Sequence, residues 1–324
     1  MTVIFSTHPL DPQVSDLLRG SGDYRVASAP TPDAIDAESS GAEIIVVRAP
    51  IDPAIVRREA GLRACVRHGA GLDMIPVDHC TAAGVLVANV PGANALTVAE
   101  HGLWSALALL RRYPAVHADL RDGGWQVARG HADLGRELSG RRIGIVGMGN
   151  VGQALARIAK HGFGMEILAV TRRPDDLPDG VTAATLDEML AQCDVVVLCC
   201  PLTAETRGLI GAEELALMRP GAVLVNVARG PLVDEAALVA ALSDGRLGGA
   251  ALDVFDSQPL AADHQFLRLK NVILTPHMAG ITQESMLRMG LGVVGEVRLI
   301  LAGDKPRNFC NPCVWPRYKA RFPT

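Results

Sequence analysis

Three glycines, Gly147, Gly149 and Gly152, stand in the segment IGIVGMGNVGQALARIAK at the spacing GxGxxG. The motif follows an apolar run typical of a strand, opens a stretch typical of a helix, and is followed by a second strand-like run, EILAV. In that setting the glycines allow a tight turn, the approach of a pyrophosphate and close helix packing, in that order. The free N–H groups at the helix N-terminus favour the anion. The segment therefore predicts a dinucleotide site that includes Asn150 and Val151.

The residues at the end of EILAV bear on which dinucleotide binds. An NAD site usually has an acid there, which bonds the ribose 2′-hydroxyl. This chain has Thr171, Arg172 and Arg173 instead, with no carboxylate. Two guanidinium groups can hold a 2′-phosphate through paired hydrogen bonds, although a solvated surface pair is the alternative. The sequence thus favours NADP(H) over NAD(H).

The elements that must position this site are short apolar runs alternating with helical stretches. From Arg142 onward, helical segments separate most of the strand-like runs, which are RIGIVG, EILAV, DVVVLCC, AVLVNV, GAALDV and VILTP. Such alternation predicts a parallel sheet with helices on both faces. An earlier series comprises VIFS, EIIVV, ACV and VLVAN, with helices expected between Pro9 and Gly20 and after Asp52. We therefore expect an α/β protein with two Rossmann-like, doubly wound parallel-sheet domains.

The length of 324 residues is also more than one hydrophobic core usually serves. Two long helical stretches could cross between the domains, NALTVAEHGLWSALALLRRYP and ITQESMLRMGLGVVGEVRLILAG. In the first, Thr97 and Glu100 have the spacing of a capping box. We expect a discontinuous substrate-binding domain of residues 1–95 plus 290–324, a dinucleotide-binding domain of residues 96–289, and a ligand in the cleft between them.

Composition excludes several classes of function. The formal net charge of −4 and the scattered arginine pairs argue against a nucleic-acid partner. No segment is apolar enough to span a membrane and the N-terminus does not resemble a signal peptide, so we expect a cytoplasmic protein without a membrane partner. The seven cysteines form no disulfide framework, and Cys310 and Cys313 are a lone pair, so no metal site is predicted.

Several blocks along nearly the whole chain resemble the D-isomer-specific 2-hydroxyacid dehydrogenases. They are HGAGLD (68–73), VPGANALTVAEH (90–101), VGMGNVG (146–152), CPLTAETRGLI (200–210), NVARGPLVDEAAL (226–238), GAALDVFDSQPL (249–260) and TPHMAG (275–280). The resemblance implies an oxidoreductase that transfers hydride between a nicotinamide cofactor and a small 2-oxo acid or (R)-2-hydroxy acid, similar to glyoxylate/hydroxypyruvate reductases. It also implies a homodimer.

The resemblance assigns catalytic roles to Arg229, His277 and Gln258. Arg229 matches the family's substrate arginine, whose guanidinium pairs with a carboxylate and polarises the adjacent carbonyl; the alternative is a salt bridge to Asp234 or Glu235. His277 matches the catalytic histidine, which protonates the carbonyl oxygen during reduction. Gln258 stands where most of the family have a glutamate that partners the histidine and raises its pKa.

The glutamine leaves three possibilities open. His277 is less readily protonated while a small 2-oxo acid is still reduced, or another substrate relaxes the need for an acid, or Asp256 supplies the carboxylate. The formate dehydrogenases, a branch of the same superfamily, also have a glutamine at this site. A formate-dehydrogenase-like enzyme and a dinucleotide-sensing protein similar to the corepressors of this fold are therefore the alternatives to a reductase.

Other positions carry over from the matching blocks one by one. Those implied to bind substrate are Ala70 and Gly71, through backbone N–H groups, and Asn94. Those implied to bind cofactor are Pro201 and Thr206 near the adenosine, Val227 through its backbone, and Asp253 at the nicotinamide carboxamide. For Asp253 the alternative is that its carboxylate only ties down its own loop.

Overall fold

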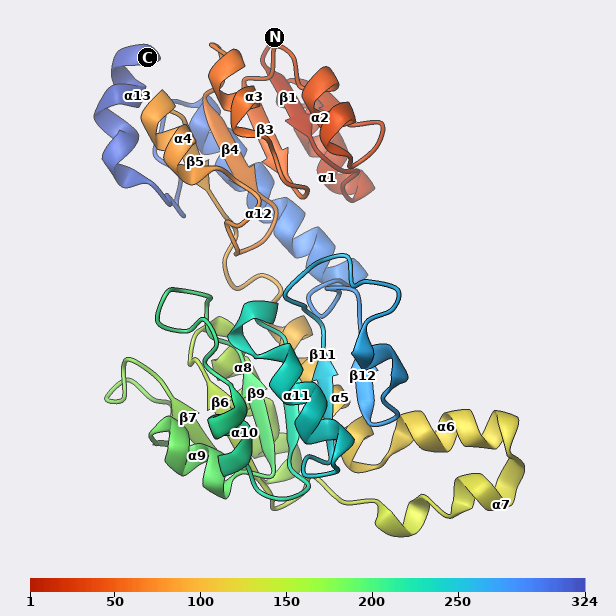
Figure 1. Ribbon diagram of the computed structural model, residues 1–324. Helices are drawn as coiled ribbons and strands as arrows, with labels where there is room; N and C mark the ends of the chain where they lie inside the picture. The colour runs from red at the N-terminus through yellow and green to blue at the C-terminus, as the bar shows by residue number, and fades with distance from the viewer. Residues whose placement is uncertain (324) are drawn as a thin grey trace. The chain divides into compact units, whose positions relative to one another are not determined.

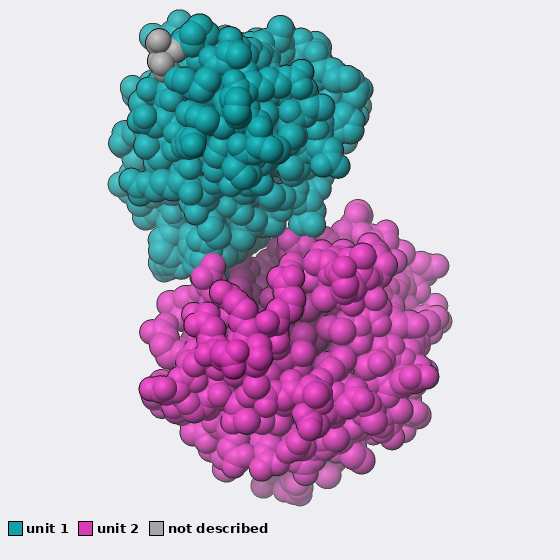
Figure 2. All heavy atoms as spheres, turned by 90° about the vertical axis from the view of Figure 1, so that its left-hand side faces the viewer, with its two compact units in different colours: residues 1–94, 281–324 teal, residues 95–280 magenta. Residues whose placement is uncertain are grey.

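The computed structural model describes residues 1–323, which form two compact units. Unit 1 comprises residues 1–94 and 281–324, and unit 2 comprises residues 95–280 (Figure 2). The chain passes from unit 2 back to unit 1 before the last long helix, so all of that helix belongs to unit 1. Along the described residues, no helix combines the length and apolar character needed to cross a lipid bilayer.

Unit 1 is built on a five-stranded parallel sheet with the strand order β2-β1-β3-β4-β5. The strands are β1 (Val3–Ser6), β2 (Asp23–Val26), β3 (Ile44–Val47), β4 (Ala64–Arg67) and β5 (Leu86–Ala88). Its helices are α1 (Pro12–Arg19), α2 (Pro32–Glu38), α3 (Pro53–Arg58), α4 (Val77–Ala83), α12 (Gln283–Leu301) and α13 (Trp315–Arg321). Buried side chains of α1, α12 and α13 cover one face, and those of α2, α3 and α4 cover the other.

Local sequence explains where the first helices of unit 1 begin. Asp11, Thr31 and Asp52 each precede a proline, and each side chain accepts a hydrogen bond from a backbone N–H of the helix that follows. A polar cap satisfies an otherwise unpaired donor, and proline at the first helical position gives up no hydrogen bond. The starts of α1 and α3 agree with the helices expected between Pro9 and Gly20 and after Asp52, whereas α2 was not predicted.

Unit 2 contains a seven-stranded parallel sheet with the order β12-β11-β10-β9-β6-β7-β8 (Figure 1). The strands are β6 (Arg142–Val146), β7 (Glu166–Val170), β8 (Val181–Ala183), β9 (Val195–Leu198), β10 (Val223–Asn226), β11 (Gly249–Leu252) and β12 (Val272–Leu274). The helices packed on it are α5 (Ala95–Leu110), α8 (Asn150–Phe163), α9 (Leu186–Gln192), α10 (Ala212–Leu217) and α11 (Glu235–Ser243). The strand order reverses between β6 and β9, which is where such sheets bind ligands.

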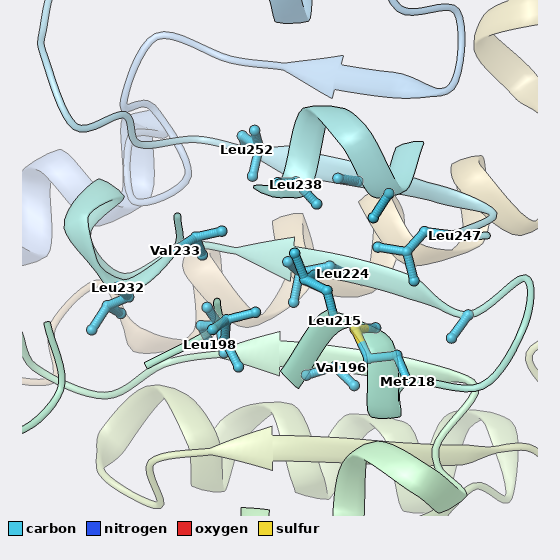
Figure 3. Close-up of a cluster of buried hydrophobic side chains, with 14 of the residues drawn as sticks. Val196, Leu198, Leu215, Met218, Leu224, Leu232, Val233, Leu238, Leu247 and Leu252 are labelled. Atoms are coloured by element: carbon cyan, nitrogen blue, oxygen red, sulfur yellow. The ribbon is translucent and has the colours of Figure 1, made fainter. Parts of the chain in front are cut away.

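Two hydrophobic layers hold the helices of unit 2 on its sheet. Side chains of α5 and α8 fill one layer. The other joins α9, α10 and α11 to the opposite face, and Figure 3 shows part of it, where Leu224 and Leu252 of the strands meet Leu215 and Leu238 of the helices. Because both faces are covered, the central strands are apolar over most of their length, as in other parallel sheets, with Arg142 at the start of β6 and Asn226 at the end of β10 as polar residues.

The segment after α5 leaves the body of unit 2 as a pair of short helices (Figure 1). Arg112 has a positive φ of 52°, which ends α5, and α6 (Tyr113–Asp122) and α7 (Gly124–Arg129) follow. No residue of α6 is buried. We call residues 113–129 the arm.

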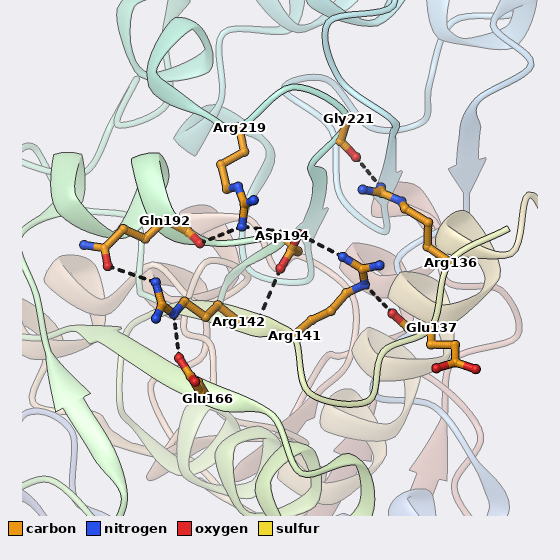
Figure 4. Close-up of polar contacts among 9 residues, drawn as sticks. All are labelled: Arg136, Glu137, Arg141, Arg142, Glu166, Gln192, Asp194, Arg219 and Gly221. Carbon is orange, nitrogen blue, oxygen red and sulfur yellow. Dashed lines mark hydrogen bonds and ion pairs between the residues drawn. The ribbon is translucent and has the colours of Figure 1, made fainter. Parts of the chain in front are cut away.

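At the edge of the sheet where β6 and β9 begin, arginines surround Asp194, which is 8% exposed (Figure 4). The carboxylate accepts from Arg141 Nη1 at 3.1 Å and from the Arg142 backbone N–H at 3.3 Å, and it lies 3.5 Å from Arg219 Nη1. Arg136 donates to the Gly221 carbonyl instead, and burial lowers its pKa. These contacts fix the starts of the central strands, at the edge opposite to their carboxyl ends.

The predicted fold class is confirmed, since both sheets are parallel and covered by helices on two faces. The capping box expected at Thr97 is wrong. α5 begins at Ala95, so Thr97 lies inside the helix and is buried. A capping box is present instead at the start of α12, where Thr282 accepts from the Ser285 backbone.

Candidate functional site

The glycine-rich loop connects β6 to α8 at the point where the strand order reverses. Gly147 has φ 97°, and a Cβ there would lie 2.8 Å from the Cα of Cys200, two residues beyond the end of β9. A Cβ on Gly152 would overlap the Gly147 carbonyl oxygen. Both positions therefore require glycine so that the loop, the helix and the neighbouring strand can pack together.

Gly149 differs, because a Cβ built on it would have no atom of the described chain within 4 Å, apart from Gly149 itself, its two chain neighbours and the adjacent helix backbone. Packing within the described chain therefore gives no reason for a glycine there. Gly149 is the N-cap of α8 and no side chain caps this end of the helix, so Asn150 and Val151 present their backbone N–H groups at an uncapped N-terminus. This cradle fits the pyrophosphate of a dinucleotide.

Thr171, Arg172 and Arg173 follow the end of β7. The Thr171 hydroxyl accepts from the Arg173 N–H at 3.2 Å, and the Arg173 guanidinium lies 3.5 Å from Asp176, with both side chains mostly exposed. Arg172 lies close enough to Glu205 to contribute to the lowering of its pKa, after hydrogen bonds from Thr203 and the backbone. Arg172 therefore lies near the loop of residues 201–206.

A hydrogen-bonded turn shapes that loop. The Thr206 hydroxyl donates to the Pro201 carbonyl at 2.8 Å and accepts from the Thr203 N–H at 2.8 Å. The loop follows β9, so it borders the glycine-rich loop at the point where the strand order reverses. The structure thus brings together the predicted adenosine-side residues and the predicted pyrophosphate loop.

Arg229 lies just beyond the carboxyl end of β10, in a backbone held by Asn226. The Asn226 side chain, 1% exposed, accepts from the Ala228 N–H at 3.1 Å and donates to the Arg229 carbonyl at 2.9 Å. Val227 lies between them, half-buried. A Cβ on Gly230 would overlap the backbone of Phe255, so the Arg229 turn packs directly on the loop that leads to Gln258.

Asp253 follows β11 and is 3% exposed. Its carboxylate accepts from the Thr275 hydroxyl at 2.6 Å and from the N–H groups of Met278 and Ala279 at 2.8 and 2.9 Å. Its carbonyl accepts from the His277 N–H at 2.8 Å. Asp253 therefore holds the loop that carries His277, whose backbone adopts the unusual φ of 53°.

His277 and Gln258 are paired, with 3.1 Å between the ring Nδ1 and the amide Oε1. With the amide oxygen as acceptor, Nδ1 carries a proton and Nε2 is the ring nitrogen that can give or take one. Gln258, not Asp256, contacts the ring in this arrangement. His101 lies on the other side of Thr275, 3.5 Å from its hydroxyl, and burial lowers its pKa.

In unit 1 the carboxyl edge of the sheet gathers cationic and imidazole groups that the sequence analysis did not single out. Arg48 follows β3, Arg67 ends β4, and His68 comes next. Burial first, and then the charges of Arg48 and Arg67, lower the pKa of His68 to about 4. His8 follows β1, and its pKa is lowered by burial and by Arg48. The sequence does indicate this cluster, because a polar residue comes directly after each of the three neighbouring strands β1, β3 and β4.

The predicted substrate residues of unit 1 border this edge. Arg67 donates to the Gly71 carbonyl at 3.0 Å, and the Asn89 side chain donates to the Ala70 carbonyl at 2.7 Å. These contacts hold the 69–71 loop. Asn94 is the last residue of the first segment of unit 1.

Residues 103–279 match the family model described as "D-isomer specific 2-hydroxyacid dehydrogenase, NAD binding domain". The D-3-phosphoglycerate dehydrogenase of Methanocaldococcus jannaschii is 34% identical over 317 residues, which are 96% of this chain and 60% of that protein. The chain thus spans about 60% of the length of the curated phosphoglycerate dehydrogenases that it matches.

Two relatives match over most of their own length. The glyoxylate reductase of Korarchaeum cryptofilum is 38% identical over 266 residues, covering 81% of this chain and 80% of that one. The structure of the NADPH-dependent glyoxylate/hydroxypyruvate reductase of Sinorhizobium meliloti, in complex with citrate, superposes with a TM-score of 0.85 at 28% identity. That superposition covers 98% of this chain and 99% of the other.

Proposed function

Because the chain belongs to the D-isomer specific 2-hydroxyacid dehydrogenase family, we propose that it is an NADPH-linked reductase that converts small 2-oxo acids to (R)-2-hydroxy acids. One observation carries the proposal. Arg229 and the hydrogen-bonded pair of His277 and Gln258 all follow the carboxyl ends of adjacent strands of unit 2, and the Arg229 turn packs on the loop of Gln258. An open α/β sheet binds ligands at that edge.

In the proposed reaction, the Arg229 guanidinium pairs with the substrate carboxylate and polarises the neighbouring carbonyl. A bound nicotinamide dinucleotide supplies the hydride that the carbonyl carbon accepts. His277 donates the proton on Nε2 to the carbonyl oxygen, so the carbonyl becomes a hydroxyl. In oxidation Nε2 takes the hydroxyl proton. Gln258 holds the ring through Nδ1, which keeps Nε2 as the working nitrogen.

Arg172 and Arg173 support NADP(H) over NAD(H). They follow β7 where an acid would otherwise bond the ribose 2′-hydroxyl, and Thr171 stands in place of that acid. The S. meliloti relative is named as NADPH-dependent. The ion pair between Arg173 and Asp176 is mostly exposed, so it costs little to exchange for a 2′-phosphate.

Glyoxylate and hydroxypyruvate are the substrates that we propose first, because relatives that match over most of their length are named for them. A 2-oxo acid with a second anionic group is the second candidate. The specific observation in its favour is the carboxyl edge of the sheet of unit 1, where the half-buried guanidinium groups of Arg48 and Arg67 flank His68 next to the 69–71 loop. The phosphoglycerate dehydrogenase relatives are named for a 2-hydroxy acid that carries such a second anionic group.

The decisive experiment measures turnover of glyoxylate, hydroxypyruvate and phosphohydroxypyruvate with NADPH and with NADH. Reduction of at least one acid, faster with NADPH at low cofactor concentration, is the expected result. Oxidation of formate alone would favour the formate-dehydrogenase-like alternative. Absence of turnover with every acid, together with tight NADPH binding, would refute the reductase and favour a dinucleotide sensor.

Arg229→Lys tests the proposed site directly. Lysine keeps the charge but cannot form the paired hydrogen bonds of a guanidinium, so kcat/KM should fall by about 100-fold or more. Arg246→Lys is the matched control, because Arg246 also donates to backbone carbonyls, those of Leu215 and Met218, on another side of unit 2. Equal losses in both variants would remove Arg229 from the proposed site.

We propose further that the chain forms a homodimer through the arm. The exposed apolar side chains of this region are Tyr113, Leu120, Trp125 and Val127, and Trp125 is 70% exposed. α6 buries none of its own residues. Large exposed apolar side chains gathered on one short segment are typical of a protein interface, and a second copy is the partner that the family resemblance implies.

A further inference from the structure

Glu235, the first residue of α11, contacts the loop of Gln258 and has no part in the proposed chemistry. Its Oε1 accepts from the Asp256 N–H at 2.9 Å. Its Oε2 lies 3.2 Å from Nε2 of His264. One carboxylate therefore binds two points of the segment between β11 and β12, on either side of Gln258.

Other contacts hold both partners of this interaction, His264 and Glu235, in place. His264 Nδ1 accepts from the Phe266 N–H at 3.3 Å, so the ring proton is on Nε2 and is donated to Glu235. The ring also packs against Phe266, which is fully buried, with 4.7 Å between ring centroids. Asp234 caps α11 by accepting from the Ala237 N–H, which fixes the start of the helix that carries Glu235.

Asp256 is two residues from Gln258, and Gln258 holds the Nδ1 side of His277. We propose that Glu235, oriented by His264, is a positioning residue that sets the loop of residues 254–259 so that the Gln258 amide reaches the His277 ring. This rests on the proposed function of His277.

The hydrogen bond from the Asp256 N–H to Glu235 matters in this chain because residue 258 is a neutral amide. A carboxylate at 258 would be drawn to an imidazolium by its charge, whereas an amide makes only a neutral hydrogen bond. The position of the amide then depends on where the backbone places it. A charged acceptor on the Asp256 N–H gives the stronger hydrogen bond that such placement needs.

The experiment compares Glu235→Ala with Glu188→Ala. Glu188 is a matched control, because it also lies in the first turn of a helix of unit 2 and accepts a backbone N–H, that of Thr185, at 2.9 Å. Glu235→Ala should lower kcat by about 10-fold, since a small displacement of the acid–base pair is costly, while KM and the Kd of NADPH change little. Glu188→Ala should leave kcat unchanged.

A double-mutant cycle separates positioning from general stability. In a Gln258→Ala background, Glu235→Ala should cause no further fall in kcat, because the amide that it positions is gone. His264→Asn keeps a side chain that can cap the Phe266 N–H but cannot reach Glu235, so it should act in the same direction as Glu235→Ala. Equal falls in both backgrounds, or an equal fall with Glu188→Ala, would overturn the proposal.

NMR of the histidine rings distinguishes failure of this inference from failure of the proposed function. The His277 ring resonances should shift in Glu235→Ala and not in Glu188→Ala, whether or not any 2-oxo acid is reduced. If they shift and no acid is reduced, the positioning role stands and the reductase assignment fails. If acids are reduced and the ring resonances do not move, the positioning role fails alone.

Discussion

Each residue proposed to act on substrate is held in place by a buried neighbour that has no proposed contact with the substrate. Asn226 closes the turn that presents Arg229, and Asp253 binds the loop that presents His277. Because these holders are almost fully enclosed, their hydrogen bonds compete little with water. At the scale of residues, the positions of Arg229 and His277 therefore depend on the buried amide of Asn226 and the buried carboxylate of Asp253.

Gln258→Glu should extend reduction to higher pH. A carboxylate beside the His277 ring stabilises the imidazolium and raises its pKa, so the proton donor persists further into the alkaline range. The falling limb of the plot of kcat/KM for reduction against pH should move up by about one pH unit. The Kd of NADPH should not change, and a superimposable pH profile would show that residue 258 does not set the protonation of the ring.

The pKa of about 4 at His68 predicts a pH-dependent stability. The unfolded chain binds a proton on this ring near pH 6.5, whereas the folded protein binds it only near pH 4, so stability is complete above 6.5 and is lost as pH falls towards 4. Between pH 7 and pH 5 the loss should be roughly 2 kcal/mol.

Urea unfolding at pH 7 and pH 5 measures that loss. His68→Leu removes the ring and should reduce the difference in unfolding free energy between the two pH values by the same amount. An unchanged difference in this variant would mean that other groups account for the acid sensitivity.

At the scale of elements, Asp194 joins the starts of β6 and β9 to the loop before β10. Asp194→Ala leaves Arg141 and Arg219 without their shared carboxylate and should lower the free energy of unfolding by about 3 kcal/mol. Glu166→Ala breaks the exposed ion pair with Arg142 and should cost less than about 1 kcal/mol. Circular dichroism during urea titration compares them, and similar costs would contradict the account.

The sequence predicts the central strands of both sheets and the edge strands β5 and β12, but it misses the other edge of each sheet. Runs such as those of β3 and β9 are apolar at every position, because helices cover both faces. β2, with the sequence DYRV, and β8, with VTA, lie at sheet edges, are partly exposed and lack that composition. The break between α5 and α6 was also missed, because Arg112 in a left-handed conformation has no local sequence signature.

The candidate site was predictable only where a short motif defines it. The glycine spacing located the turn after β6, and matching blocks located Arg229, Gln258 and His277. The contacts of Asn226 and Glu235, by contrast, join residues brought together by the packing of one loop on another, which no spacing along the chain encodes. His68 is buried through the same kind of tertiary contact.

At the scale of the whole molecule, the arm makes the proposed dimer testable. Trp125→Glu places a charge on its exposed apolar surface and should shift the molar mass from that of a dimer towards 34.2 kDa, the mass of one chain. Light scattering coupled to size exclusion measures the mass. Lys270→Glu, a similar change at an exposed position outside the arm, is the control, and a monomeric parent protein would refute the dimer.

Unit 2 is continuous in sequence, whereas unit 1 is assembled from the first and last segments of the chain. Buried residues of α12 and α13, such as Val297 and Tyr318, complete the core that Ile4 and Leu18 begin. On the ribosome, residues 1–94 emerge before unit 2 but lack the buried side chains of α12 and α13 until residues 281–323 are made. The nucleotide-binding half should therefore fold during synthesis, while residues 1–94 wait until residues 281–323 have been made and depend on protection from aggregation in the interval.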